Sequence, residues 1–155
     1  MLRSIEGNFD NTDVHELLVK HFIELRSVSP VGSAHVLDIN GLKHSSIKFW
    51  SLWENDVLIG SGALKILNKG HGEFKSIRIN DKFRNKGYGL KVINHLIIEA
   101  KILKIKQLSL ETGAGDFFLP ARKLFKRCGF EVCKPFFDYK EDVNSVYMTL
   151  LINNG

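Results

Sequence analysis

The chain has 155 residues, of which 44% are hydrophobic and 25% are charged, and its formal net charge is +5. This length suits one domain, residues 1–155, and the composition is that of a globular protein rather than a disordered or fibrous one. No apolar run approaches membrane-spanning length, and charged residues near the N-terminus prevent an apolar run there. We therefore expect a cytoplasmic protein with no signal peptide and no membrane partner.

The N-terminal part predicts one strand and one long helix. Residues 2–5 indicate a short edge strand. Asn11 or Thr12 can cap a helix that continues to about Ser27, because apolar side chains recur on one helical face. Residues 35–44 have a weaker pattern, which predicts a short helix or an ordered loop.

Three consecutive strands are predicted next. Residues 47–53, 57–67 and 73–79 are rich in strand-forming residues and are separated by short turns, which indicates an antiparallel meander. Gly60 and Gly62 lie inside the second of these strands. Glycines in a strand interior indicate a bulge or the close approach of another backbone.

A basic loop with two glycines, residues 83–90, follows this meander and leads into a helix. Gly87 and Gly89 have no Cβ, so the backbone can approach a ligand closely, and the free N–H groups of the first helical turn can point at an anion. Arg84 and Lys86 add positive charge. The loop matches neither the dinucleotide fingerprint nor the Walker motif. It predicts a phosphate cradle, with an ordinary strand-to-helix turn as the alternative.

The second half of the chain returns to the sheet. Residues 107–111 predict a strand parallel to the one before the glycine loop, because a crossing helix lies between them. The loop then lies at the carboxyl end of a parallel pair, where open α/β sheets bind ligands. A helix from Pro120 to Cys128 and strands at 130–133 and 146–152 complete the chain.

The cysteines and histidines do not predict a metal site. Cys128 and Cys133 are too few for a disulfide framework or, without further ligands, for zinc, and the six histidines lack metal-binding spacing. Positive charge gathers at the glycine loop, which favours an anionic cofactor. We do not expect a nucleic-acid partner, because no second basic stripe with interleaved aromatic residues is present.

Two motifs in the right order resemble the GNAT N-acetyltransferase superfamily. Residues 77–89 look like its acetyl-CoA motif, whose core is Arg/Gln-x-x-Gly-x-Gly/Ala, and residues 121–130 resemble its final helix and Gly-Phe turn. With the strand order, the resemblance covers nearly the whole chain. It implies an α/β fold with a mixed sheet of six to seven mostly antiparallel strands and about four helices. One parallel pair would splay open at the cofactor site.

The resemblance also implies how acetyl-CoA, the co-substrate, is held. Pantetheine would lie in the opening of the sheet and pair with the backbone, and N–H groups of the glycine loop would bind the pyrophosphate. The acetyl group would pass directly to an amine of a small molecule or protein, and family members are often homodimers. The cofactor-binding residues so implied are Ile77, Arg78, Ile79, Arg84, Asn85, Lys86, Gly87, Tyr88, Gly89, Leu90 and Phe125.

Two positions depart from the family pattern. Phe125 stands where many relatives place a tyrosine that is often proposed to protonate the leaving thiolate, so we expect Phe125 to pack beside pantetheine. Phe118 replaces a frequent asparagine. A thiol has an ordinary pKa of about 8.5, so water or a backbone N–H could assist its departure. These departures motivate the alternative of a non-catalytic acyl-CoA-binding module.

An amine acceptor calls for a general base. An amine with a pKa of about 10.4 is protonated at pH 7, and exposing its lone pair costs about 4–5 kcal/mol. Glu73 is the first catalytic candidate, because it opens the strand beside the predicted acetyl end of the cofactor; a surface carboxylate is the alternative. Further candidates for the chemistry are Tyr139, His35, Glu111 and Asp138. Candidates for lining an acceptor pocket, or for the core, are Trp50, Trp53, Phe136 and Phe137.

Overall fold

Seven strands form one mixed sheet in this computed structural model, which describes residues 2–28 and 38–152; their order is β1-β2-β3-β4-β5-β7-β6. The strands are β1 (Leu2–Glu6), β2 (Ile47–Glu54), β3 (Val57–Asn68), β4 (His71–Ile79), β5 (Gln107–Gly113), β6 (Glu131–Cys133) and β7 (Ser145–Leu151). The helices are α1 (Thr12–Val28), α2 (Ile39–Leu42), α3 (Tyr88–Ile102) and α4 (Leu119–Arg127), with 3-10 turns at Asp81–Phe83 and Asp116–Phe118. The predicted fold class is confirmed.

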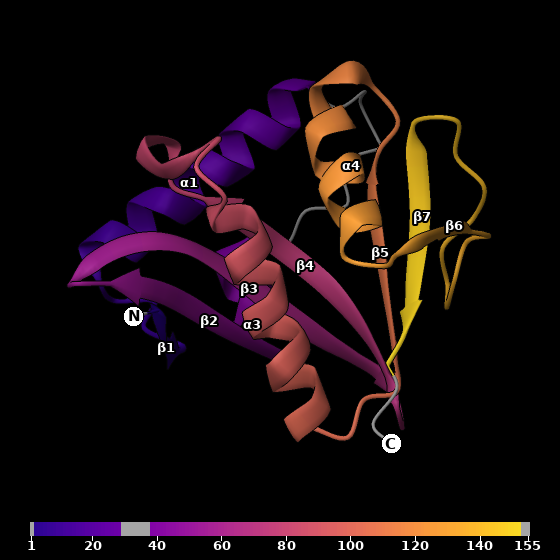
Figure 1. Cartoon of the computed structure of the whole chain (residues 1–155), viewed down its shortest axis with the longest axis horizontal. Coiled ribbons are helices and arrows are strands. Elements are labelled where there is room, and N and C mark those ends of the chain that lie inside the picture. The colour runs from indigo at the N-terminus through magenta and orange to yellow at the C-terminus, as the bar shows by residue number, and fades with distance from the viewer. Residues whose placement is uncertain (1, 29–37, 153–155) are drawn as a thin grey trace.

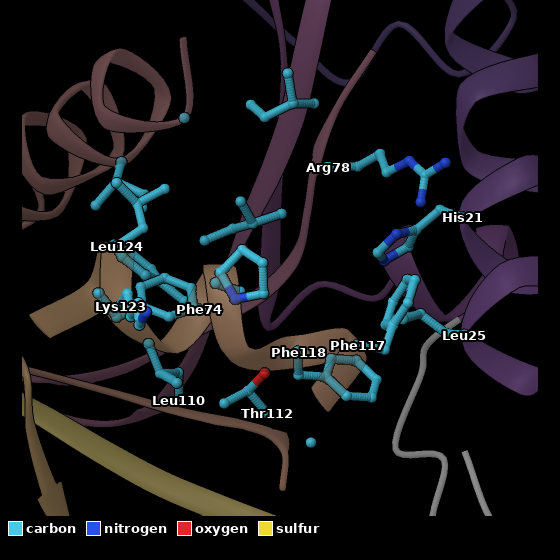
Figure 2. Close-up of a pocket in the computed structure, with 18 of the residues that line it drawn as sticks. His21, Leu25, Phe74, Arg78, Leu110, Thr112, Phe117, Phe118, Lys123 and Leu124 are labelled. Carbon is cyan, nitrogen blue, oxygen red and sulfur yellow. The ribbon is translucent and has the colours of Figure 1, made fainter. Parts of the chain in front are cut away.

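The sheet opens between β4 and β5, its one parallel pair among the described strands. Pairing joins only His71, Gly72 and Glu73 to three residues at the start of β5. Figure 1 shows the two strands close together at one end and diverging toward the other. The predicted splay is therefore present, and it opens into the cavity shown in Figure 2.

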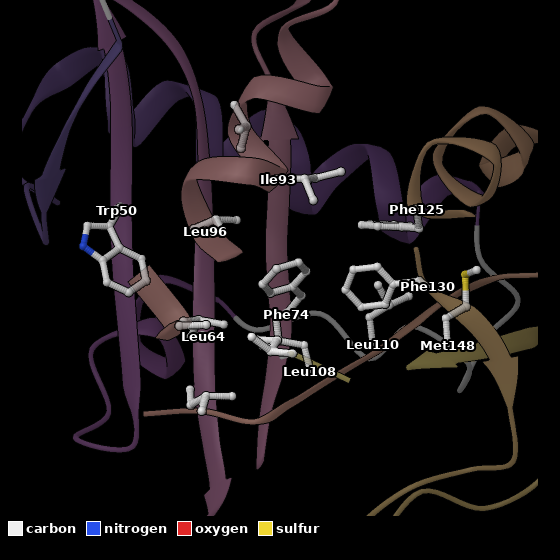
Figure 3. Close-up of a cluster of buried hydrophobic side chains, with 14 of the residues drawn as sticks. Trp50, Leu64, Phe74, Ile93, Leu96, Leu108, Leu110, Phe125, Phe130 and Met148 are labelled. Atoms are coloured by element: carbon white, nitrogen blue, oxygen red, sulfur yellow. The ribbon is translucent and has the colours of Figure 1, made fainter. Parts of the chain in front are cut away.

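Two hydrophobic clusters cover the two faces of the sheet. The first joins α3 and α4 to the strands, and Figure 3 shows its central residues, among them Phe74, Leu96 and Phe125. The second packs α1 against β2 and β3. Trp50 lies in the first cluster and Trp53 in the second, and neither is more than 5% exposed. Both tryptophans are therefore core residues and do not line an acceptor pocket.

β4 carries a bulge where it borders the opening. Ser61 pairs with Arg78, but Ala63 pairs with Lys75, so β4 has one residue more than β3 over this stretch. Ser76 takes up the extra length with a φ of 53°. Because a bulge bends a strand and increases its twist, this one helps β4 to turn away from β5.

Gly60 lies against the backbone of β4, which confirms the predicted close approach. A Cβ at this position would collide with the carbonyl oxygen of Arg78. Both groups belong to paired strands, so Gly60→Ala should lower the free energy of unfolding by about 1–3 kcal/mol. Urea unfolding would measure this, with Gly115→Ala as the control, because a Cβ there meets nothing within 4 Å and the φ is −71°. Equal losses in the two variants would contradict the backbone collision.

Candidate active site

The opening between β4 and β5 is a cavity of about 1160 Å³. Its walls come from both strands, α1, α4 and the glycine loop. Figure 2 shows labelled side chains of the two strands, α1 and α4 around it. Phe74 reaches it from the face of the sheet that α3 and α4 cover, and His21 reaches it from the face that α1 covers. The cavity thus connects the two faces of the sheet through the gap in its pairing.

The glycine loop has the backbone conformation that the predicted anion cradle would need. Gly87 is the N-cap of α3 with a φ of 83°, a left-handed conformation that glycine adopts without strain. Among the described residues, no side chain caps this helix, so N–H groups of its first turn remain for a ligand. A Cβ at Gly89 would lie 2.7 Å from Cδ2 of Leu124 on α4. The space at this position admits backbone but not a side chain.

Most of the residues predicted to bind the cofactor line this one cavity. They are Ile77, Arg78, Ile79, Arg84, Asn85, Gly87, Gly89, Leu90 and Phe125. Among the described residues, the exceptions are Lys86, which is exposed, and Tyr88. The Tyr88 ring packs edge-on against Phe83 at 5.2 Å, and the Lys91 ammonium lies 4.9 Å from its centroid. Tyr88 therefore braces the start of α3.

The two predicted catalytic residues meet at the narrow end of the opening. Tyr139 Oη donates a hydrogen bond to Glu73 Oε2 at 2.6 Å. Lys75 Nζ lies 3.2 Å from the same carboxylate oxygen and donates to Tyr139 Oη at 3.1 Å. The Glu73 side chain is 3% exposed and that of Lys75 is 10% exposed. Glu73 is thus a buried, ion-paired carboxylate and not the surface carboxylate of the alternative interpretation.

Tyr139 holds its proton in this cluster. Burial, followed by the charge of Glu73, raises the pKa of Tyr139 above its ordinary value of 10.0. At neutral pH Tyr139 is therefore a protonated phenol that donates a hydrogen bond to Glu73, and it is not a phenolate that could act as a base. The geometry gives Tyr139 the role of orienting the carboxylate.

Lys75 is the member of this cluster that sequence reasoning missed. Residues two apart in a strand point to the same face, so Lys75 had to accompany Glu73 toward α1. The sequence did contain a signal for Lys75. It is a lysine two residues after a candidate base, in a strand that is buried on both faces. Its ammonium offsets the charge of the buried carboxylate.

The remaining candidates are dispersed. Glu111 on β5 lines the cavity, and its Oε2 accepts a hydrogen bond from Ser145 Oγ at 2.7 Å. Asp138 is exposed, and His35 lies outside the described residues. The Phe136 ring packs against Tyr139 and Tyr147 with centroids 5.0 and 6.1 Å apart, so it supports the ring whose hydroxyl bonds to Glu73. The Phe137 side chain is 59% exposed.

A second polar cluster, not predicted from the sequence, ties α1 to β4 and the glycine loop. Arg78 donates from Nη1 to Glu24 Oε1 at 2.6 Å and from Nη2 to Asp81 Oδ1 at 3.2 Å. Arg84 contacts the same two oxygens, each at 3.2 Å. Hydrogen bonding from Arg78 and then Arg84 lowers the pKa of Glu24 despite its partial burial. The side chain of Arg78 is therefore a structural tie as well as a part of the cavity wall.

His21 is buried beside this cluster. Burial, followed by the positive charge of Arg78, lowers the pKa of His21 from 6.5 to about 4. The unfolded chain binds a proton on His21 at a higher pH than the folded chain does. The free energy of unfolding therefore decreases as the pH falls from 6.5 toward 4. From pH 7 to pH 5 the loss in the free energy of unfolding should be about 2 kcal/mol from this residue.

The His21→Phe variant should lack this part of the pH dependence. Urea unfolding at pH 7 and pH 5 would measure it, with His15→Phe as the control, because His15 is exposed on the same helix. The control should keep the pH dependence of the parent protein. If His21→Phe also kept it, the histidine would not be buried in its neutral form.

Neither a membrane span nor a metal site is found in the described part of the chain. No helix there is both long enough and apolar enough to cross a bilayer. No group of three His, Cys, Asp or Glu side chains there is arranged to bind a metal ion.

Comparisons with known proteins identify the family. The profile of the acetyltransferase (GNAT) family matches residues 11–130. The uncharacterized N-acetyltransferase YsnE of Bacillus subtilis (strain 168) is 46% identical over 136 residues, which are 88% of this chain and 90% of that protein. The uncharacterized N-acetyltransferase YedL of Escherichia coli (strain K12) is 35% identical over 139 residues, 90% of this chain and 87% of that protein.

A solved structure shows the same fold. The crystal structure of a Bacillus subtilis acetyltransferase in complex with CoA superposes with a TM-score of 0.73, at 17% identity, over 99% of this chain and 100% of that chain. The chain belongs to the acetyltransferase (GNAT) family, and it is an acyltransferase.

Proposed function

We propose that the chain, acting as one catalytic domain, transfers an acetyl group from acetyl-CoA directly to an amine of a small molecule or protein. The observation that carries this proposal is the buried Glu73 carboxylate, which lies at the narrow end of the same cavity that the glycine loop borders. Family membership supports the class of reaction, and the CoA complex of the Bacillus subtilis structure supports the donor.

The cavity fits the donor at two places. The loop around Gly87 and Gly89 offers N–H groups with room for an anion, and Arg84 and Lys86 add positive charge, as a pyrophosphate requires. Beyond Glu73, β4 pairs with β3 but separates from β5, so its second edge carries backbone groups that can pair with an extended ligand. The pantetheine amides would occupy this edge.

The acceptor chemistry falls to the cluster around Glu73. Acetyl-CoA would supply the activated thioester. The amine nitrogen bonds to the acetyl carbon as the carbon–sulfur bond breaks, and Glu73 takes the proton that leaves the nitrogen. The thiolate takes a proton from water, and the hydroxide so formed takes the proton from Glu73, which restores the carboxylate. Lys75 offsets the charge of Glu73, and Tyr139 orients it. Phe125 lines the cavity and has no proton to donate.

Two measurements test this function. Isothermal titration of the protein with acetyl-CoA should show micromolar binding, and thiol release over a broad panel of primary amines should show turnover. A lack of acetyl-CoA binding would contradict the assigned donor. Tight binding without turnover of any amine in the panel would contradict the transfer.

A further inference from the structure

Two buried nitrogen atoms on the α1 side of the cavity have no hydrogen-bond partner among the described residues. They are Nδ1 of His21 and Nε of Arg78, and each residue is only 5% exposed. Proteins satisfy nearly all buried polar groups, so an unsatisfied one requires an explanation. Two of them on neighbouring side chains that both line a ligand cavity indicate that a ligand group supplies the missing partner.

The two side chains face each other across the cavity wall. Figure 2 shows the His21 ring, which projects from α1, beside the Arg78 guanidinium, which projects from β4. The charge of Arg78 contributes to the lowered pKa of His21, as expected for close neighbours. Both side chains therefore border the same region of the cavity.

The other atoms of the Arg78 guanidinium are already occupied. Nη1 and Nη2 donate to Glu24 at 2.6 and 3.4 Å, and Nη2 also donates to Asp81 at 3.2 Å. Arg84 bonds to both of these carboxylates, and Lys20 lies 3.4 Å from Asp81. Three cations thus accompany two carboxylates, and an incoming anion meets no excess of negative charge.

The two free atoms suit a carboxylate. The Arg78 Nε–H is always a donor, and neutral His21 donates from Nδ1 when its one ring proton is there. Two adjacent donors match the two oxygens of a carboxylate, and the guanidinium strengthens the hydrogen bond by its charge. Leu25, Phe117 and Phe118 line the cavity close to this pair, as Figure 2 shows, and provide an apolar surface for the body of a ligand.

We propose that His21 and Arg78 form a carboxylate-binding subsite and that the acceptor is a small amine that also carries a carboxylate. This assignment rests on the proposed acetyl transfer, with Glu73 taking the proton of the amine. Arg78 lies five residues beyond Glu73 on β4, a separation on the order of 15 Å along a strand, which the bulge shortens. The amine and the carboxylate of the acceptor are therefore several bonds apart.

Matched amines test this subsite. The pairs are 4-(aminomethyl)benzoate with benzylamine, and 6-aminohexanoate with n-pentylamine, in which the second member lacks only the carboxylate. The parent enzyme should show a kcat/KM for each amino carboxylate that exceeds that of its partner by roughly tenfold or more, the effect of one charged hydrogen bond.

The variants assign this preference to the two nitrogens. His21→Phe keeps an aromatic ring but removes Nδ1, and it should bring the ratio within a pair close to one and leave acetyl-CoA binding unchanged. Arg78→Lys keeps the charge but removes Nε, and it should also bring the ratio close to one. His21→Asn, whose amide can replace the Nδ1 donor, should restore part of the preference. His15→Phe, exposed on the same helix, should leave the ratio as in the parent.

A binding measurement separates the subsite from the transfer reaction. The probe is 4-methylbenzoate, which has no amine, titrated into the CoA-saturated protein. Binding that His21→Phe weakens would support the subsite even if no amine were acetylated, and it would then be the proposed function that failed. Turnover with equal kcat/KM within each pair, or probe binding that neither variant changes, would overturn the subsite and leave the transfer in place.

Discussion

The Glu73→Gln variant should lose acetyl transfer by a factor of about 100 to 10,000, with acetyl-CoA bound as tightly as by the parent. Glutamine keeps the shape of the side chain and can still accept a hydrogen bond from Tyr139, but it cannot take a proton from the acceptor amine. Initial rates of thiol release with an accepted amine, together with isothermal titration of acetyl-CoA, would measure the two quantities.

Two controls isolate the proton transfer. Glu16→Gln, an exposed carboxylate on α1, should behave as the parent. Tyr139→Phe removes the hydroxyl that donates to Glu73 and accepts from Lys75, so it should lower kcat by roughly tenfold without changing the KM for acetyl-CoA. Retention of the parent rate by Glu73→Gln would show that another group, with Glu111 first among those in the cavity, takes the proton.

The second large effect is expected at the glycine loop, where Gly89→Asp should weaken acetyl-CoA binding by about 100-fold or more. The new carboxylate would repel the pyrophosphate, and its Cβ would press on Leu124, which lies 2.7 Å from the position of that atom. Isothermal titration would measure the affinity.

A double variant separates charge from steric pressure in this loop. Gly89→Ala adds the Cβ alone, and Gly89→Ala with Leu124→Ala also removes the side chain that this Cβ meets. The double variant should regain affinity over Gly89→Ala, and both should bind better than Gly89→Asp. Affinity of Gly89→Asp equal to that of the parent would show that the pyrophosphate lies elsewhere.

The fold followed from local features of the sequence. Apolar periodicity marked the strands and helices, and the helix between two strands required them to be parallel. The tryptophans show where this reasoning ends: Trp50 and Trp53, three residues apart on β2, point to opposite faces of the sheet, and helices cover both faces. Burial of both residues therefore depended on the packing of α1 and α3, which no pattern within the strand contains.

The candidate site could be predicted only one residue at a time. Glu73 and Tyr139 were separate candidates, but they are 66 residues apart in the chain, and their hydrogen bond depends on the path of the loop after β6. Glu24 and Arg78 are 54 residues apart, and their contact depends on how α1 packs on the sheet. The glycine loop could be interpreted directly, because its function depends on backbone conformation and on residues that are neighbours in the chain.

The short pairing of β4 with β5 has a consequence for the cooperativity of unfolding. Three residue pairs, the first hydrophobic cluster and the hydrogen bonds of Tyr139 with Glu73 and Lys75 join the half of the sheet containing β1 to β4 to the half containing β5 to β7. A ligand bridging the gap binds only the folded state, so mass action raises the stability of the joint between the halves. Binding of the donor would therefore increase the cooperativity with which the two halves of the sheet unfold.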